Sequence, residues 1–487
     1  MGHRASNRSR WRAWVRTEKD HYMKTITYVK RSQLNHSATT VFNWHCREGA
    51  FERLTPPWQP AETIEKLGSI EDNGTITIKT KLGPLSSKWF LKHIDFIQDR
   101  QFADILIKGP FAYWKHIHKM EPQDEETCIL EDEIEFSMRG GIVGNILGGP
   151  IVKNLLQKMF TYRHNVLRSD LLSHSRYQSD GITKILISGS TGLIGQALSS
   201  YLSTGGHQVV RLVRTSDLED EGTIFWDPLN HIIDIESLEG FDYVIHLAGE
   251  NVGESRWTKK KKGRISDSRI NGTKFLTESL SHLKCPPKAL LCASATGYYG
   301  DAGNDLVNEQ SPNGAGFLAQ VVENWEQSTR SATDQGMRVV NLRFGVVINP
   351  MGGALKKLLM PFKLGFGGKI GHGKQYMSWI SLDDAICAIH HVMLNSTVEG
   401  PINIASPNTV TNEEFTRQLG ATLNRPTVAT IPAFIIKIMF GQMGKETILA
   451  STRVDSTKLS QSGYTHIFSH IEEALNHYLG KSKDYEI

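Results

Sequence analysis

Three glycines at a spacing of three residues are the clearest chemical signal in this sequence. Gly189, Gly192 and Gly195 follow the apolar run KILIS (184–188) and lead into a helix-like stretch. Without Cβ atoms, such a loop turns tightly, brings backbone N–H groups to a pyrophosphate and points a helix N-terminus at its charge. The sequence therefore predicts a nucleotide-phosphate loop, with a tight turn that binds nothing as the alternative. The predicted loop residues are Gly189, Ser190, Thr191, Gly192, Leu193, Ile194 and Gly195.

The residues after the next apolar run indicate which nucleotide this loop would hold. QVVRLV (208–213) is followed by Arg214, and no acidic residue comes before Asp217. NAD sites usually place a carboxylate here for the ribose 2′-hydroxyl, whereas a guanidinium suits a 2′-phosphate. We therefore expect NADP in preference to NAD, with Arg214 as a contact. The stretch HLAGEN should lie under the adenine and its ribose through Leu247, Ala248, Gly249 and Glu250.

Apolar runs alternate with helical stretches throughout the second half of the chain. The runs are 184–188, 208–213, 242–248, 288–294 and 337–348. Such alternation predicts a doubly wound, parallel α/β sheet of the Rossmann type, covered on both faces.

Hydroxyl groups gather after the run 288–294, where ligands of open α/β sheets bind. The candidate catalytic residues are Ser294, Thr296, Tyr298 and Tyr299. Either tyrosine could serve as an acid, and Ser294 or Thr296 could bind a substrate oxygen. A ribose contact or a core hydrogen bond is the alternative for each.

Other charged residues are assigned to the surroundings of this site. Arg343 is expected at the cofactor and, with Asp383 and Asp384, in the pocket between two lobes. The run KKKKGR (259–264) is expected to form a solvated helix face, with a substrate-phosphate contact as the alternative.

These motifs resemble the extended branch of the short-chain dehydrogenase/reductase superfamily. The matching segments are SGSTGLIG, LAG and SATGYYG (294–300). The further segments LAGENVGESRWT (247–258) and FIIKIMFGQMGKETILASTRV (434–454) resemble its atypical, epimerase-like group. Members of this group end in a small domain of unknown function and include proteins once labelled cell-division inhibitors. The resemblance covers essentially all of 184–480.

This resemblance implies an NADP-dependent epimerase or oxidoreductase acting on an undefined small molecule. The superfamily's YxxxK proton-transfer motif is absent, because Phe317 and Val321 stand where its Tyr and Lys would fall. The atypical group shares this loss. A non-catalytic NADP-dependent sensor or scaffold therefore remains the alternative.

The N-terminal part shows a different periodicity of apolar residues. The stretches 74–80, 87–97, 112–120 and 131–138 alternate with period two and follow one another without helices. They predict a curved antiparallel sheet, followed by a helix from Pro150 to about Ser173. This order, with GPFAYWKHIHKM (109–120), resembles the SRPBCC (START-like) helix-grip family. The resemblance implies an α+β domain that binds an apolar small molecule, and some bacterial members of the epimerase-like group are fused to such a domain.

Two histidines of this part share one strand face. His116 and His118 are two residues apart, and no third ligand is visible in the sequence. We therefore expect solvated or hydrogen-bonded strand histidines and no metal, with a metal site as the alternative.

Composition limits the classes of partner and the cellular location. The net charge is only +4 over 487 residues, which gives no case for nucleic acid, and no apolar run is long enough to span a bilayer. Five scattered cysteines without a CxxC pair suit a reducing cytoplasm. The predicted organisation is a tail or over-called start (1–22), the helix-grip domain (23–175), a linker (176–183), the Rossmann domain (184–402) and a small C-terminal domain (403–480).

Overall fold

The computed structural model describes residues 25–82, 85–177, 181–215 and 222–484. The predicted tail 1–22, residues 178–180 of the predicted linker and Asp217 lie outside these ranges. The chain divides into two compact units. Unit 1 comprises Met1–Asn43 and Gln59–Phe160, and unit 2 comprises Trp44–Trp58 and Thr161–Ile487.

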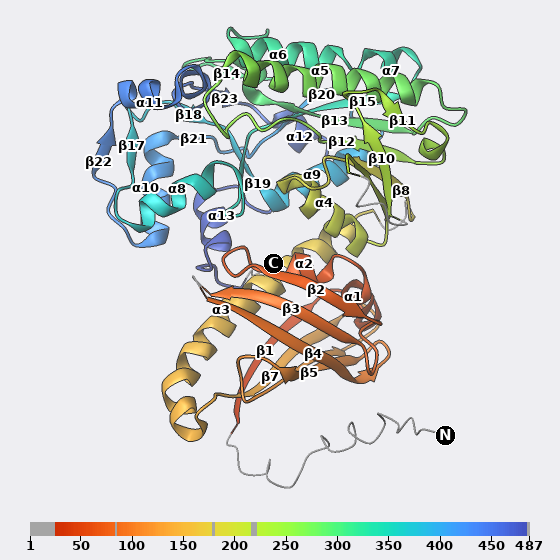
Figure 1. The fold of residues 1–487 in the computed structure, drawn as a ribbon, viewed down its shortest axis with the longest axis vertical. Coiled ribbons are helices and arrows are strands. Elements are labelled where there is room, and N and C mark those ends of the chain that lie inside the picture. Colours follow the sequence, from red (N-terminus) through yellow and green to blue (C-terminus); the bar gives the residue numbers. More distant parts are fainter. Residues whose placement is uncertain (1–24, 83–84, 178–180, 216–221, 485–487) are drawn as a thin grey trace, which may run out of the picture. The chain divides into compact units, whose positions relative to one another are not determined.

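The described part of unit 1 is built on a seven-stranded antiparallel sheet with the order β1-β7-β6-β5-β4-β3-β2 (Figure 1). Its strands are β1 (Ile26–Leu34), β2 (Ala61–Leu67), β3 (Thr75–Leu82), β4 (Leu85–Ile97), β5 (Gln101–Lys108), β6 (Tyr113–Pro122) and β7 (Cys128–Ser137). The four predicted runs are confirmed as β3, β4, β6 and β7, because alternation places apolar side chains on one face of a sheet. β1, β2 and β5 are additional strands.

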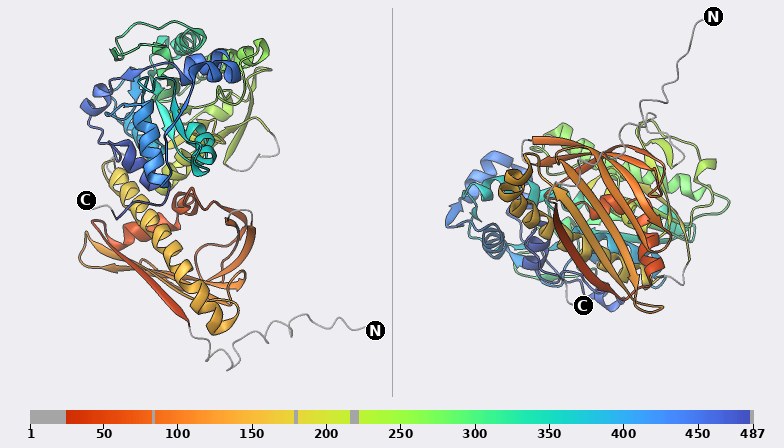
Figure 2. Two further views of the ribbon diagram at one scale, coloured as in Figure 1. Left: turned by 90° about the vertical axis from the view of Figure 1, so that its left-hand side faces the viewer. Right: turned by 90° about the horizontal axis from the view of Figure 1, so that it is seen from below.

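One face of this sheet packs on the first half of helix α3 (Gly141–Ser175), as Figure 2 shows. Tyr28, Trp114 and Phe136 from the strands meet Leu156 and Phe160 from the helix in one buried cluster. This cluster of unit 1 is therefore largely aromatic.

The predicted start of this helix at Pro150 is wrong. Helix α3 begins at Gly141, and Pro150 lies inside it. The proline ring normally excludes helical backbone before it by meeting the Cβ of the preceding residue. That residue is Gly149, which has no Cβ, so the helix continues through the proline.

Unit 2 contains a sheet with the order β11-β10-β9-β8-β12-β13-β15-β20 among its described residues. Its strands are β8 (Lys184–Ser188), β9 (Gln208–Val213), β10 (Thr223–Asp227), β11 (Ile232–Ile233), β12 (Tyr243–His246), β13 (Ala289–Ala295), β15 (Arg338–Phe344) and β20 (Gly400–Ile404). All neighbouring pairs are parallel except β10 with β11. The strand order reverses between β8 and β12, which confirms the predicted Rossmann-type sheet.

Helices cover both faces of this sheet (Figure 1). Helices α4 (Leu193–Thr204) and α9 (Leu382–Leu394) lie on one face, and α5 (Lys259–Ser281), α6 (Phe317–Gln327) and α7 (Arg330–Asp334) lie on the other. No helix in the described ranges has both the length and the apolar character needed to cross a bilayer.

The run 337–348 is not one strand, as predicted, but two. β15 stays in the main sheet, whereas β16 (Val346–Ile348) pairs with β19 (Trp379–Ser381). Gly345 separates the two strands, and a Cβ there would lie 2.9 Å from the Ser378 carbonyl oxygen. The close backbone approach of the β19 segment thus redirects the chain away from the main sheet.

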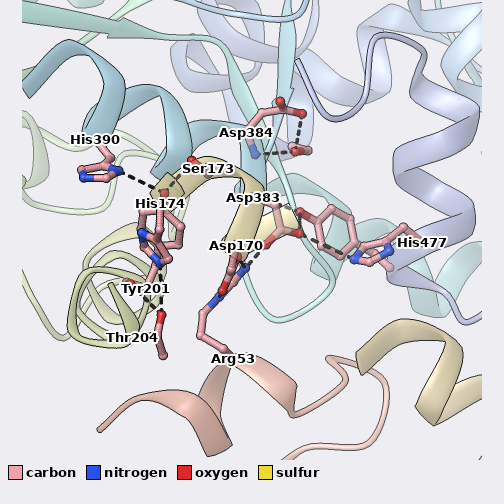
Figure 3. A network of polar contacts seen from close by, with 12 residues as sticks. Arg53, Asp170, Ser173, His174, Tyr201, Thr204, Asp383, Asp384, His390 and His477 are labelled. Atoms are coloured by element: carbon pink, nitrogen blue, oxygen red, sulfur yellow. Dashed lines mark hydrogen bonds and ion pairs between the residues drawn. The ribbon is translucent and has the colours of Figure 1, made fainter. Parts of the chain in front are cut away.

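A buried ion network joins segments of unit 2 that are distant in sequence (Figure 3). Arg53 of α2 (Ala50–Leu54) donates to Asp170 Oδ2 at 2.8 Å and Oδ1 at 2.6 Å, and to Asp383 Oδ1 at 2.9 Å. Tyr478 donates to Asp383 Oδ2 at 2.8 Å. A single guanidinium thus holds two buried carboxylates, one from α3 and one from α9.

Acid should destabilise unit 2 through two buried histidines. Burial lowers the pKa of His246 from 6.5 to about 4, and burial with neighbouring histidines lowers that of His390 to about 3. Because the unfolded chain binds these protons more readily, stability is full above pH 6.5. It should fall with pH, by at most about 1.4 kcal/mol per pH unit for each histidine, until the folded pKa values are reached. Urea unfolding at several pH values measures this slope, and His246→Gln should flatten it; an unchanged slope would contradict the assignment.

Candidate functional site

The glycine loop follows β8 and lies against the backbone that follows β12. Gly189 has a φ of +71°, and a Cβ there would lie 2.6 Å from the Leu247 carbonyl carbon. A Cβ on Gly195 would lie 2.3 Å from the Gly189 carbonyl oxygen. Only glycine fits these two positions, so the loops after β8 and β12 can meet where the strand order reverses.

The loop also presents groups that fit a nucleotide phosphate. No side chain of the described residues caps the N-terminus of α4, and both Thr191 and Gly192 are exposed there. The Ser190 hydroxyl is buried and has no hydrogen-bond partner among the described residues. An unpartnered buried hydroxyl is unfavourable unless a ligand satisfies it. Helix N–H groups and this hydroxyl would together receive a pyrophosphate.

Positive charge gathers around Glu250, which follows β12. Lys261 Nζ donates to Glu250 Oε1 at 2.6 Å, and Arg264 Nη2 lies 3.3 Å from the same oxygen. The Lys261 hydrogen bond, with the charges of Lys261, Arg264 and Arg214, lowers the pKa of Glu250. Arg214 itself is exposed just beyond β9. We call Arg214, Lys261 and Arg264 the basic cluster.

The predicted solvated face of KKKKGR is therefore confirmed only in part. Lys259 and Lys260 are exposed, but Lys261 is only 3% exposed. Its ammonium group lies between Glu250 and Glu254. The negative charges of these two residues offset the free-energy cost of removing the ammonium group from water.

A polar cluster stands at the carboxyl ends of β13 and β15. Ser294 Oγ donates to Glu326 Oε1 at 2.6 Å. Arg343 donates to the same carboxylate through Nε and Nη2, each at 2.7 Å. Sequence reasoning missed Glu326, which lies on α6 among other polar residues and has no distinguishing signal in the sequence.

Tyr299 is tied into this polar cluster. Its hydroxyl accepts from Arg343 Nη1 at 3.0 Å and donates to Asn403 Oδ1 at 2.8 Å. Burial raises the pKa of Tyr299 to about 12. These contacts hold the ring in the core and use its proton internally.

Tyr298 and Thr296 differ from Tyr299 in exposure and bonding. Both are half-buried, and neither hydroxyl makes a hydrogen bond to any described residue. The Arg343 guanidinium carbon lies 3.6 Å from the Tyr298 ring centroid, so the ring is held by a cation–π contact. These two hydroxyls are available to a ligand.

The two positions of the missing motif serve packing. Val321 is buried with Trp257 and Ile265, and Phe317 packs edge-on against Trp257 with ring centroids 5.2 Å apart. Asp383 and Asp384 are also structural. Asp384 accepts from the Ile467 and Phe468 N–H groups and so attaches α9 to the C-terminal segment.

The amino-acid sequence of this chain is similar to that of known proteins and protein families. Residues 185–405 match the NAD dependent epimerase/dehydratase family, and residues 431–478 match a domain of unknown function (DUF1731). The chain is 37% identical over 293 residues to "Epimerase family protein Mb2239" of Mycobacterium bovis, which covers 60% of this chain and 96% of the relative.

Two solved structures extend the comparison. The nucleoside-diphosphate sugar epimerase from Corynebacterium glutamicum is 31% identical with a TM-score of 0.77, over 94% of this chain and 91% of that chain. The human epimerase family protein SDR39U1 (isoform 2), solved with NADPH, is 31% identical with a TM-score of 0.57, over 61% of this chain and 99% of that chain. The bacterial structure therefore has counterparts of both units.

Proposed function

This chain belongs to the epimerase family of proteins, and on that premise we propose that unit 2 binds NADP(H) at the Gly189–Gly195 loop and acts on a small molecule. The observation that carries the proposal is the buried, unpartnered Ser190 hydroxyl within a loop that admits only glycine at Gly189 and Gly195. The human relative solved with NADPH supports the same nucleotide.

The basic cluster supports NADP over NAD. A 2′-phosphate carries up to two negative charges, and guanidinium groups pair with it more strongly than with a ribose hydroxyl. Arg214 is exposed just after β9. Rossmann-type proteins contact the ribose 2′-hydroxyl or 2′-phosphate of the dinucleotide at this place. Lys261 and Arg264 are already engaged with Glu250, so Arg214 is the cluster member left for the phosphate.

Replacing Arg214 with alanine should weaken NADPH binding about tenfold, or about 1.4 kcal/mol, and leave NADH binding unchanged. Titration of the full chain, followed by nicotinamide fluorescence, measures both affinities. Arg330→Ala, at an exposed site on α7, is the matched control. Equal losses for the two nucleotides would argue that Arg214 does not contact the 2′-phosphate, and absence of binding by the wild-type chain would refute the nucleotide site.

In the proposed reaction, the Gly189–Gly195 loop would hold NADP(H), which would provide hydride chemistry at a substrate carbon. The Tyr298 hydroxyl donates a proton to the substrate oxygen when a carbonyl is reduced, and takes it back when the alcohol is oxidised. Thr296 holds that oxygen by a hydrogen bond. Arg343 keeps the Tyr298 ring in place, and Glu326 in turn keeps Arg343 in place.

Binding without turnover is the second candidate function. It is favoured by the internal hydrogen bonds of Ser294 and Tyr299 and by the apolar residues Phe317 and Val321 at the motif positions. Loss of NADPH absorbance with a panel of carbonyl compounds, including keto-sugar nucleotides, separates the two. Turnover supports the enzyme, whereas tight NADPH binding without consumption by any of them supports the sensor.

We further propose that unit 1 is a helix-grip domain of the SRPBCC (START-like) type that holds an apolar small molecule. Its support is the aromatic cluster packed between the sheet and α3, where Trp89 lies edge-on against Trp114 with ring centroids 5.2 Å apart. Aromatic side chains offer broad apolar area to such a ligand.

A further inference from the structure

Neighbouring strands of unit 1 carry histidines and aspartates on the buried face of the sheet. In the ladder, His93 of β4 lies opposite Asp104 of β5, which lies opposite His116 of β6. His118 of β6 lies opposite Asp132 of β7. Directly opposite residues point to the same face. Five imidazole and carboxylate groups from four strands therefore share one small area.

Three of these groups already converge on one point. His116 Nε2 lies 2.9 Å and His118 Nδ1 lies 2.6 Å from Asp132 Oδ1. One ligand atom of each residue lies within 4.8 Å of the others. A tetrahedral zinc ion with bonds of about 2.0–2.1 Å separates such atoms by about 3.3 Å. Small side-chain rotations would make room for the ion.

We propose that His116, His118 and Asp132 bind a divalent first-row transition-metal ion, such as Zn²⁺ or Co²⁺. Two imidazoles with one carboxylate form an established ligand set for these ions. Asp132 is the third ligand that the sequence did not reveal, since it lies on the neighbouring strand.

The groups around this triad fit an outer ligand shell. Asp104 Oδ2 lies 3.9 Å from His116 Nδ1, the nitrogen left over when Nε2 binds metal. A carboxylate at that nitrogen fixes the tautomer of a metal-binding histidine. His93, opposite Asp104, is only 9% exposed, and its Nδ1 makes no hydrogen bond within the described residues.

Aromatic rings flank the two histidines of the site. His118 stacks on Phe102 with ring centroids 4.3 Å apart, and His116 meets Phe160 edge-on at 5.3 Å. Lys30 is buried on β1 and lies opposite Asp132 in the strand register.

The ion would have a free position for a ligand. Three protein ligands leave a tetrahedral ion with one open coordination position. A carboxylate or hydroxyl oxygen of a small molecule inside unit 1 would fill it. The metal would then orient an otherwise apolar ligand.

Titration of the metal-free full chain with Co²⁺ tests this site. We expect one Co²⁺ per chain, a visible d–d absorption band, displacement by Zn²⁺ and a higher unfolding temperature in the presence of metal. Asp132→Asn and His118→Gln should each weaken binding at least about 100-fold, and Asp104→Asn about tenfold.

The controls separate this site from general metal binding by histidines. His372→Ala removes an exposed histidine of unit 2 and should bind Co²⁺ like the wild-type chain. Circular dichroism checks that each variant is folded, and Asp132→Asn keeps the shape of the side chain. The proposal would be overturned if the wild-type chain failed to bind Co²⁺. It would also be overturned if the Asp132→Asn and His118→Gln variants bound Co²⁺ as tightly as the wild-type chain.

Discussion

Replacing Gly192 with glutamate should reduce NADPH affinity at least about 100-fold, or about 2.7 kcal/mol. Gly192 is the N-cap of α4, is exposed and has a φ of −77°, so the backbone accepts a side chain there. The new carboxylate would occupy the N–H groups proposed for the pyrophosphate and repel its charge. The same carboxylate suits a helix N-terminus, so the fold should be unchanged or slightly more stable.

The control for this variant is Gly192→Ala. A Cβ at this position lies 3.2 Å from the Gly189 carbonyl oxygen, which requires a shift of only a few tenths of an ångström. Affinity should therefore stay within a few fold of wild type. Fluorescence titration measures binding, and thermal unfolding without nucleotide measures the fold. If the glutamate variant binds NADPH normally, the loop does not hold the phosphates.

Replacing Arg53 with methionine should reduce the free energy of unfolding by about 3–5 kcal/mol. The substitution keeps most of the side-chain volume but leaves Asp170 and Asp383 buried and facing each other without a cation. Buried carboxylates without a cation destabilise the folded state more than the original ion network does. The Arg53 guanidinium itself makes hydrogen bonds to both carboxylates, so three charge-assisted bonds disappear together.

Urea unfolding of the full chain measures this loss, with Arg330→Met as a control at an exposed arginine. Without Arg53 the two carboxylates keep protons more readily, so the difference from wild type should shrink as pH falls from 7 to 5. A loss below about 1 kcal/mol at neutral pH would show that other groups compensate the carboxylates.

Local residue patterns were enough to predict the core elements of unit 2. The runs 184–188 and 208–213 coincide with β8 and β9, and the glycine loop lies directly after β8 as expected. Short runs of β-branched residues bounded by glycine and polar residues rarely form anything but strands. Their length and periodicity can be read from neighbouring residues alone. The capping box of Thr411 and Glu414 at the start of α10 (Asn412–Leu423) is equally local, because its two residues are only three positions apart.

The site in unit 2 was only partly predictable. Ser294 and Arg343 were recognised, but Glu326, which joins them, was not. The side chain of Glu326 acquires its role when α6 packs beside the carboxyl ends of β13 and β15. No spacing within α6 signals that position.

The sequence by itself determined most of the strands of the main sheet in unit 2 and the position of the glycine loop, because these depend on side-chain periodicity and on backbone freedom at a few glycines. Tertiary structure alone decided the pairings between distant residues. Arg53 meets Asp383 across 330 positions of sequence, and Asp132 reaches His116 only because β7 pairs with β6 in one register. Such contacts form when whole helices and strands pack together and bury their surfaces. The pattern of neighbouring residues in the sequence does not specify which elements pack together.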